Sequence, residues 1–319
     1  MERVRVDCEH FLEENYFAMT PSIFNRHAFL LAAPLAAATL LLTLPFHFAQ
    51  GQDKAAAKAK GGGPPGRDRP DLIQVLMITG RNPHDWRGET AAMRQTLQES
   101  GLFDVRQVDE FRGGTAQMLA PYQLIILNYY DGGGAENANR WGAATEKAFV
   151  DFVRSGKGLI IYHLSIGAFT GWKEYEQMSA GNWRTNKGHH SAPHDWPMDI
   201  KDPEHPIMKG FKTPLLIRND ELYANLLWHP DASYHLLASA YDDHSLYGAN
   251  DRQEKIGAGT NEPILWTTQF GAGRVFVDAL GHEPFNTTTP EFKTILLRGA
   301  EWAATGKVTI PIPPELATQ

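Results

Sequence analysis

The sequence holds a single cysteine, Cys8, among 319 residues. One thiol excludes intramolecular disulfides, cysteine zinc sites and iron–sulfur clusters, because each of these needs several cysteines. Cys8 also lies in an N-terminal segment that we expect to be removed. The mature chain would then carry no thiol, which excludes catalysis by a cysteine nucleophile.

Clustered positive charge is also missing. The formal net charge is −7 and the isoelectric point is about 6.0. We expect no nucleic acid among the partners, because proteins that bind it usually carry a basic face. The loop 80–87, which follows the first expected strand, has neither the GxGxxG nor the P-loop pattern, so no nucleotide cofactor is expected. Nothing in the sequence sets an oligomeric state.

Residues 28–48 form an uncharged apolar run that follows Arg26 and precedes small residues. This is the pattern of a secretory signal peptide. The run could span a bilayer, although Pro34 and Pro45 weaken a permanent helix. We therefore expect residues 1–50 to be a cleaved signal peptide, or alternatively an uncleaved membrane anchor. Either reading predicts an exported protein, periplasmic or extracellular, that touches the membrane only through this segment.

The rest of the chain divides into three parts. Residues 51–70 are rich in Gly, Pro and Lys and are expected to form a disordered linker. Residues 71–305 are expected to fold as a single domain, since 42% of the chain is hydrophobic and no internal repeat occurs. Residues 306–319 form a proline-rich tail that is expected to lie along the surface.

The domain alternates between apolar runs and helical patterns. The runs 72–79, 123–128 and 157–163 are almost continuously apolar, which is typical of parallel strands buried on both faces. Helical spacing over 88–100 and 141–155 separates them. This alternation predicts right-handed crossovers and a doubly wound α/β sheet. Further strands are expected at 103–108, 198–202, 215–222, 234–240, 264–270 and 274–279, and further helices at 169–178 and 290–304.

Two histidines stand where such a sheet binds ligands, beyond the carboxyl ends of strands. His163 ends the run 157–163, directly after Tyr162. His282 follows the last expected strand through Gly281, whose flexibility allows the backbone to turn. We expect the two imidazoles to converge on one site; the alternative for each is an imidazole that only caps its turn.

A second cluster is the segment 188–195, GHHSAPHD, with three histidines in six residues. Imidazoles bind zinc and similar metals, especially beside carboxylates. The neighbours His189 and His190 cannot easily face one site in an extended segment, so we assign His190 to it. No fixed zinc spacing such as HExxH occurs, and the alternative is a solvated loop.

Acidic and aromatic side chains follow other strands. Asp220, Glu221 and Tyr223 come after an apolar run, where carboxylates could orient sugar hydroxyls, act as a base or ligate a metal. The alternative is a turn with solvated carboxylates.

The loop after the first strand carries His84 and Trp86, and its composition suits sugar binding by stacking and hydrogen bonds, although its aromatic residues could equally be core. The residues that we expect to contact substrate are His84, Trp86, Asn128, Tyr162, His190, Asp220 and Tyr223.

Taken in order, these motifs resemble the ThuA-like family, which is linked to the use of trehalose and related disaccharides with 3-keto-sugars as suggested intermediates. The resemblance covers residues 72–305. It rests on the segments 162–163, 188–190, 202–210, 220–223, 263–266, 270–276 and 280–282.

The resemblance implies a fold similar to class I glutamine amidotransferases: a flavodoxin-like three-layer sandwich around a mostly parallel sheet. Those enzymes carry a cysteine at the sharp turn after a central strand. Here His163 occupies or neighbours that turn and the mature chain has no thiol, so amidotransferase chemistry is excluded. Family membership alone does not supply a mechanism.

We therefore predict an exported enzyme that acts on a disaccharide, glycoside or 3-keto-sugar. His163 and His282, with His190, would hold a divalent metal such as zinc, manganese or iron, or His163 and His282 would serve as acid and base, in both cases with Glu221 as their carboxylate partner. A 3-keto group acidifies the neighbouring carbon–hydrogen bond, so proton abstraction there would allow elimination or isomerisation.

Two alternatives remain. The first is a non-catalytic sugar-binding module, favoured by the aromatic and asparagine-rich loops. The second is a hydrolase that uses Ser165, although the first glycine of the GxSxG pattern is replaced by His163.

Overall fold

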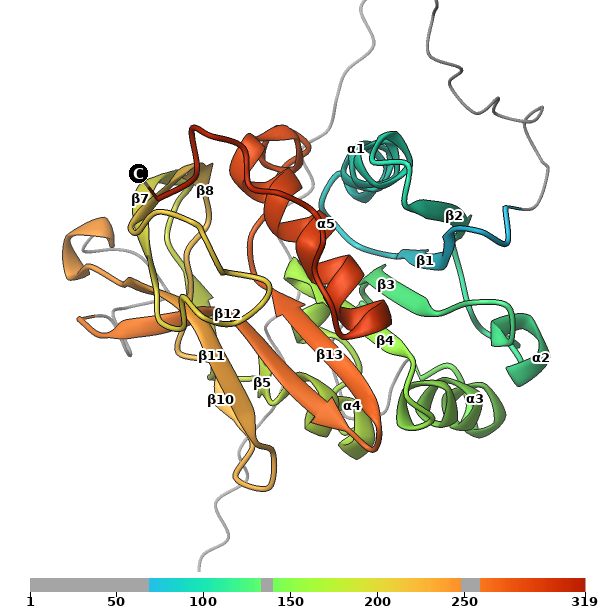
Figure 1. Ribbon diagram of the computed structural model, residues 1–319. Helices are drawn as coiled ribbons and strands as arrows, with labels where there is room; N and C mark the ends of the chain where they lie inside the picture. The colour runs from blue at the N-terminus through green and yellow to red at the C-terminus, as the bar shows by residue number, and fades with distance from the viewer. Residues whose placement is uncertain (1–68, 133–139, 248–258, 319) are drawn as a thin grey trace, which may run out of the picture. The chain divides into compact units, whose positions relative to one another are not determined.

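The computed structural model describes residues 69–132, 140–247 and 259–318 (Figure 1). The signal peptide or anchor predicted over 1–50 and nearly all of the linker predicted over 51–70 lie outside the described residues. Within the described ranges, no helix combines the length and the apolar character that a membrane crossing requires.

A nine-stranded mixed sheet forms the centre of the domain, in the order β2-β1-β3-β4-β13-β12-β11-β7-β8 (Figure 1). Its first five strands pair in parallel, and the predicted parallel core is thereby confirmed. The other four pairings are antiparallel, so the sheet is mixed rather than mostly parallel. The short connection between β12 and β13 allows only antiparallel pairing. The strands are β1 (Ile73–Gly80), β2 (Phe103–Val108), β3 (Leu124–Tyr129), β4 (Gly158–Tyr162), β7 (His194–Ile200), β8 (Leu215–Asp220), β11 (Tyr234–Tyr241), β12 (Asn261–Phe270) and β13 (Gly273–Asp278).

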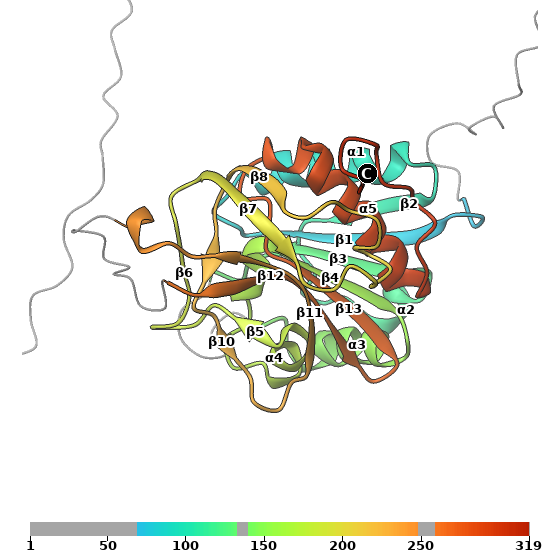
Figure 2. The same ribbon diagram turned by 60° about the vertical axis from the view of Figure 1, so that its left-hand side comes forward.

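Helices cover both faces of the parallel half, which gives the predicted three layers (Figure 2). Helices α1 (Trp86–Glu99) and α5 (Pro290–Thr305) pack side by side on one face, and α3 (Ala143–Arg154) and α4 (Lys173–Ser179) lie on the other. The bounds of α5 follow from its sequence: Thr289 caps the first turn by accepting from Phe292 N, and Gly306 ends the helix in the left-handed conformation. The short helix α2 (Ala116–Leu119) packs against α3.

The domain also contains short elements that periodicity did not predict. The segment 181–195, for which no strand is predicted above, contains β5 (Gly181–Asn182) and β6 (His189–His190). Strand β5 pairs with β10 (Leu227–Trp228), and β6 pairs with β9 (Tyr223–Ala224), which sets His190 opposite Tyr223. The 3-10 helices are η1 (His163–Gly167), η2 (His244–Leu246) and η3 (Asn286–Thr288).

The residues after α5 run back over the domain. Arg298 on α5 is buried and donates hydrogen bonds to the carbonyl oxygens of Pro206, Ile207 and Lys209, and to that of Ile310 beyond the helix. A β-bridge between Phe211 and Ala317 continues this contact. The proline-rich tail is thus bound to the loop that follows β7.

A buried polar network joins α1 to the end of β3. Asn128 Nδ2 lies 3.1 Å from Glu89 Oε2 and 3.2 Å from Thr90 Oγ1. Asn82 Nδ2 donates to Asn128 Oδ1 at 3.0 Å, and Asn82 Oδ1 accepts from His84 N at 2.9 Å. Burial raises the pKa of Glu89 from 4.5 to about 8, against the opposing hydrogen bond from Asn128. The carboxyl group is therefore largely protonated at neutral pH.

We expect Glu89→Gln to flatten the dependence of stability on pH. Between pH 4.5 and 8 the unfolded chain has released this proton and the folded chain keeps it, so stability falls as pH rises, by up to about 1.4 kcal/mol per pH unit. Chemical denaturation at pH 5 to 8 should show wild type losing more stability than the variant. Glu99→Gln, an exposed change on the same helix, is the control. If the free energy of unfolding changes with pH in the same way for wild type and for Glu89→Gln, the raised pKa of Glu89 is contradicted.

Candidate functional site

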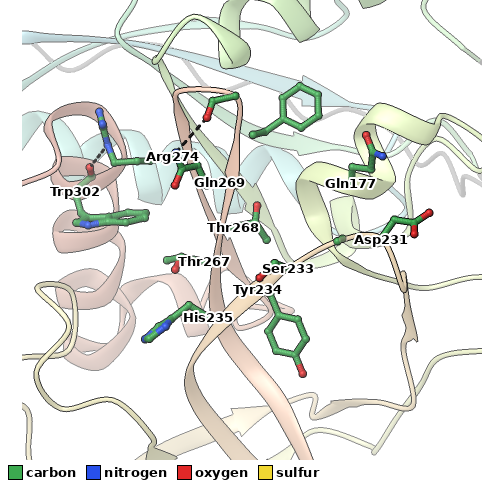
Figure 3. A pocket seen from close by; sticks show the side chains of 13 residues that line it. Gln177, Asp231, Ser233, Tyr234, His235, Thr267, Thr268, Gln269, Arg274 and Trp302 are labelled. Carbon is green, nitrogen blue, oxygen red and sulfur yellow. Dashed lines mark hydrogen bonds between the residues drawn. The ribbon is translucent and has the colours of Figure 1, made fainter.

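A cavity of about 690 Å³ lies away from the predicted site residues (Figure 3). Gln177, Gln269, Arg274 and Trp302 are among its lining residues. It opens near the start of β13 and the end of β12, at the edge of the sheet opposite to His163 and His282. Its lining contains none of the strand-end residues that carry the predicted chemistry.

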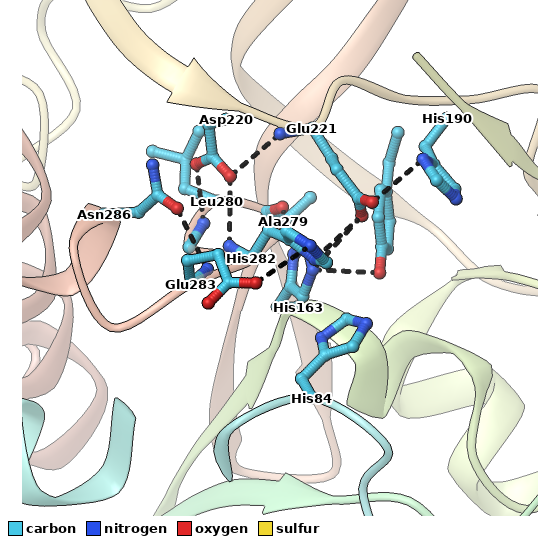
Figure 4. Close-up of polar contacts among 12 residues, drawn as sticks. His84, His163, His190, Asp220, Glu221, Ala279, Leu280, His282, Glu283 and Asn286 are labelled. Carbon is cyan, nitrogen blue, oxygen red and sulfur yellow. Dashed lines mark hydrogen bonds and ion pairs between the residues drawn. The ribbon is translucent and has the colours of Figure 1, made fainter. Parts of the chain in front are cut away.

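Four side chains meet at the carboxyl ends of the strands (Figure 4). His84 comes from the loop after β1, His163 from the end of β4, His282 from the turn after β13, and Glu221 follows β8 directly. One ligand atom from each lies within 4.8 Å of those of the others. We call these four residues the His/Glu cluster. The predicted convergence of His163 and His282 is present, with 5.7 Å between their ring centroids.

His163 is buried and its ring is oriented by the backbone. Its Nδ1 lies 2.9 Å from the carbonyl oxygen of Ala279. A carbonyl oxygen can only accept, so Nδ1 carries the hydrogen and Nε2 keeps its lone pair. Nε2 lies 3.1 Å from the hydroxyl of Tyr223 and 3.7 Å from Glu221 Oε2. Burial, reinforced by His84, lowers the pKa of His163 to about 3, so the imidazole is neutral at pH 7.

Glu221 is the carboxylate at the centre of the cluster. Its Oε1 lies 3.0 Å from His190 Nδ1, and its Oε2 lies 3.2 Å from His282 Nδ1. Burial favours the neutral acid, but the contacts with His190 and His282 outweigh it and hold the pKa of Glu221 well below its usual range. The pKa of His282 is raised in turn, because the interaction with Glu221 exceeds the effect of burial. Glu221 is therefore ionised at neutral pH.

His84 completes the cluster from the opposite loop. Its ring centroid lies 4.5 Å from that of His282 and 5.1 Å from that of His163. Burial, then the neighbouring His282, lowers the pKa of His84 to about 4. Its Nδ1 is buried and has no hydrogen-bond partner among the described residues.

This donor set fits a divalent metal ion. Three imidazoles and a carboxylate are ligands of zinc, manganese and iron sites. Metal ligands must be neutral imidazoles and ionised carboxylates, and the lowered pKa values of His84, His163 and Glu221 favour that state. The pKa of His282 is raised, so His282 would release a proton as the metal binds. A backbone carbonyl on the second nitrogen, as at His163, is the usual outer support of a metal-binding histidine.

Asp220 and Tyr162 hold the turn that carries His282. Asp220 is buried and accepts hydrogen bonds from the backbone N–H groups of Gly281 at 2.7 Å, His282 at 3.0 Å and Glu221 at 2.9 Å. The Tyr162 hydroxyl donates to the carbonyl oxygen of Gly281. Gly281 has a φ of 99°, which a side chain would rarely adopt. These contacts fix where His282 emerges.

The neighbours His189 and His190 face different partners, as the sequence suggested. His189 Nε2 lies 2.8 Å from the buried Asp242, and His190 turns toward Glu221. His190 is thus outside the group of four. The sequence predicts His190 as both a metal ligand and a substrate contact, and His84 as a substrate contact only. In the structure His84 belongs to the cluster and His190 lies beside it.

A second cavity, of about 600 Å³, adjoins the His/Glu cluster at His84. Its volume is within the range of small-molecule sites. Tyr130, Gly167 and Trp183 also line it, and none of them belongs to the site residues predicted from the sequence. The only sequence signal for Trp183 was the aromatic character of the segment 181–195.

The remaining predicted substrate residues are buried around the site rather than on the cavity wall. These residues are Trp86, Asn128, Tyr162, Asp220 and Tyr223. That they contact a ligand directly stays a prediction.

Ser165 has no available hydroxyl. Its Oγ is buried, donates to the carbonyl oxygen of Leu127 at 2.8 Å and accepts from Tyr129 N at 3.0 Å. The Ser165 hydroxyl is therefore not available as the nucleophile that the serine-hydrolase alternative requires.

Comparison with known proteins agrees with the resemblance noted in the sequence. The profile of the family described as ThuA, trehalose utilisation, matches residues 74–303. A crystal structure of a ThuA-like protein from Parabacteroides merdae is 30% identical with a TM-score of 0.66, and the match covers 77% of this chain and 95% of that one. A ThuA-like protein from Bacteroides uniformis is 17% identical with a TM-score of 0.57, covering 78% and 97%. No curated protein matches. The chain therefore belongs to the ThuA family and shares its α/β fold with the ThuA-like protein from Parabacteroides merdae.

Proposed function

We propose that the protein is a carbohydrate-processing enzyme whose His/Glu cluster binds one divalent metal ion. The observation that carries the proposal is the approach of four ligand atoms from four separate loops to within 4.8 Å of one another. The family description, trehalose utilisation, supports a carbohydrate as ligand. Its substrate would be a disaccharide, a glycoside or a 3-keto-sugar.

The protonation states favour ligation over proton transfer for His163. A group with a pKa of about 3 cannot act as a general acid near pH 7 and is a weak base. When bound, a divalent metal would polarise a carbonyl oxygen or lower the pKa of a water molecule. His190 is better placed to move a proton, because it contacts Glu221 Oε1 at 3.0 Å and its side chain is 31% exposed. Proton abstraction next to a keto group would suit this arrangement.

Metal analysis of the untagged protein tests the cluster. We expect about one zinc, manganese or iron per chain, and we expect His163→Ala to lose it, because a missing imidazole leaves three donors. His244→Ala, an exposed histidine outside the cluster, should keep the metal. Elemental analysis by mass spectrometry after dialysis gives the ratio. If the protein binds no metal after incubation with these ions, the proposed metal site is wrong, and acid–base catalysis by histidine is the mechanism that remains.

The cavity beside the cluster also supports a second candidate, a non-catalytic sugar-binding module. Incubation of the metal-loaded protein with 3-keto-glycosides separates the two. We expect product, and we expect less of it with His282→Ala, because that variant removes a partner of Glu221. Saturable sugar binding with no product over days would favour the module instead.

We also propose that the protein is exported, on the basis of the apolar run at residues 28–48 and the small residues that follow it. Intact mass measurement of the protein made in a bacterial host with a general secretion pathway is the test. A mature chain that starts near residue 51 is expected. Full-length protein confined to the cytoplasm would contradict export.

A further inference from the structure

The cavity beside the His/Glu cluster has two aromatic walls. Tyr130 follows β3 and Trp183 follows β5, and both line the cavity together with His84. Gly167, at the end of η1, lies between them: a Cβ on Gly167 would be 3.4 Å from the Tyr130 ring and 3.5 Å from the Cβ of Trp183. The absence of a side chain at Gly167 therefore keeps the space between the two aromatic residues open. We call this space the aromatic slot.

The Trp183 wall is held in place before any ligand binds. Its indole packs over Gly188, where a Cβ would lie only 2.7 Å from the ring, and meets Tyr223 edge-on at 5.2 Å between centroids. The hairpin after it is closed by two backbone hydrogen bonds between Arg184 and Lys187, of 2.8 and 2.9 Å. A wall fixed in this way loses little conformational entropy on binding.

Arg184 ties this hairpin to the segment that carries His163. Its guanidinium is buried and lies 2.9 Å from Glu176 Oε1. It also donates to the carbonyl oxygens of Gly167 and Ala168, each at 3.2 Å. The charge of Arg184 is therefore balanced within the protein, and it is not presented to the cavity as a site for a phosphate or carboxylate.

The chemistry of the lining selects an uncharged ligand with one apolar face. Aromatic rings offer flat apolar surfaces, and the polar groups nearby are the neutral side chains of Thr170, Thr185 and Asn186. A pyranose ring has this character, because its C–H groups form an apolar face and its hydroxyls point outward. An open-chain polyol has the same hydroxyls without a rigid face.

We propose that the aromatic slot binds one pyranose unit of the substrate between Tyr130 and Trp183, with the reacting carbon directed toward His84. The inference rests on the proposed function for what happens at the His/Glu cluster, whereas the binding of the sugar in the slot needs no metal. Trp183 and Gly167 are then the residues that set substrate specificity.

Calorimetry on the untagged full chain tests the slot, with trehalose and glucose as ligands and sorbitol as the open-chain comparator. Wild type should bind trehalose saturably and prefer glucose to sorbitol. Trp183→Ala should weaken trehalose binding by about tenfold or more, because it removes one stacking surface. Tyr241→Ala, at an exposed tyrosine that does not line the cavity, should bind as wild type does.

Gly167→Ala provides an independent variant that narrows the slot. The added methyl group meets its neighbours at ordinary contact distances, and the φ of Gly167 is outside the left-handed region, so the fold should be kept. Thermal unfolding checks this. We expect an unchanged Tm together with weaker trehalose binding and a higher KM in any turnover assay.

Three results would overturn the slot: unchanged trehalose binding in both Trp183→Ala and Gly167→Ala, equal binding of glucose and sorbitol, or no binding of either sugar by wild type. Failure of the slot and failure of the metal chemistry can be told apart. If the protein binds metal and forms product, and Trp183→Ala changes neither sugar binding nor turnover, the proposed function stands and the slot is wrong. If sugar binding depends on Trp183 but the protein binds no metal and forms no product, the slot stands and the proposed function is wrong.

Discussion

The charge of Glu221 is the constraint around which the site is arranged. An ionised carboxylate in a buried position is costly unless it is paired and hydrogen-bonded. His190 and His282 approach its two oxygens at 3.0 and 3.2 Å, from segments that are distant in the sequence. The neighbouring Asp220 then fixes the backbone of the His282 turn through hydrogen bonds to Gly281 and His282. Pairing one charge thus requires β8, the β6–β9 pair and the turn after β13 to meet.

The two halves of the sheet contribute different parts of the cluster. The parallel half supplies His84, His163 and His282 from loops at its carboxyl edge, as expected for a doubly wound fold. The carboxylate follows β8, the last strand of the antiparallel half. A parallel sheet alone would hold three imidazoles without their negative partner. The antiparallel extension therefore completes the electrostatics of the site.

Much of this could be predicted from the sequence, because long periodic segments and strand ends carry strong signals. Strand β2 was predicted at its observed bounds and α5 to within one residue. The meeting of His163 with His282 followed from their positions after strands. The two-residue strands β6 and β9 are too short for any period. The lowered pKa of His163 depends on complete burial, which a sequence does not show. The position of the Trp183 indole depends on its packing over Gly188, a tertiary contact that the sequence does not show.

The backbone at His163 has a consequence beyond the position of its ring. Its φ is 42°, in the left-handed region, where a residue other than glycine is held at a cost of about 1 kcal/mol or more. Glycine would adopt this conformation freely, but it would bring no imidazole to the cluster. The conformation of the turn and the presence of the imidazole therefore make opposed demands on one position. A relative with glycine there would keep the turn without strain, but its His/Glu cluster would lack one of the three imidazoles.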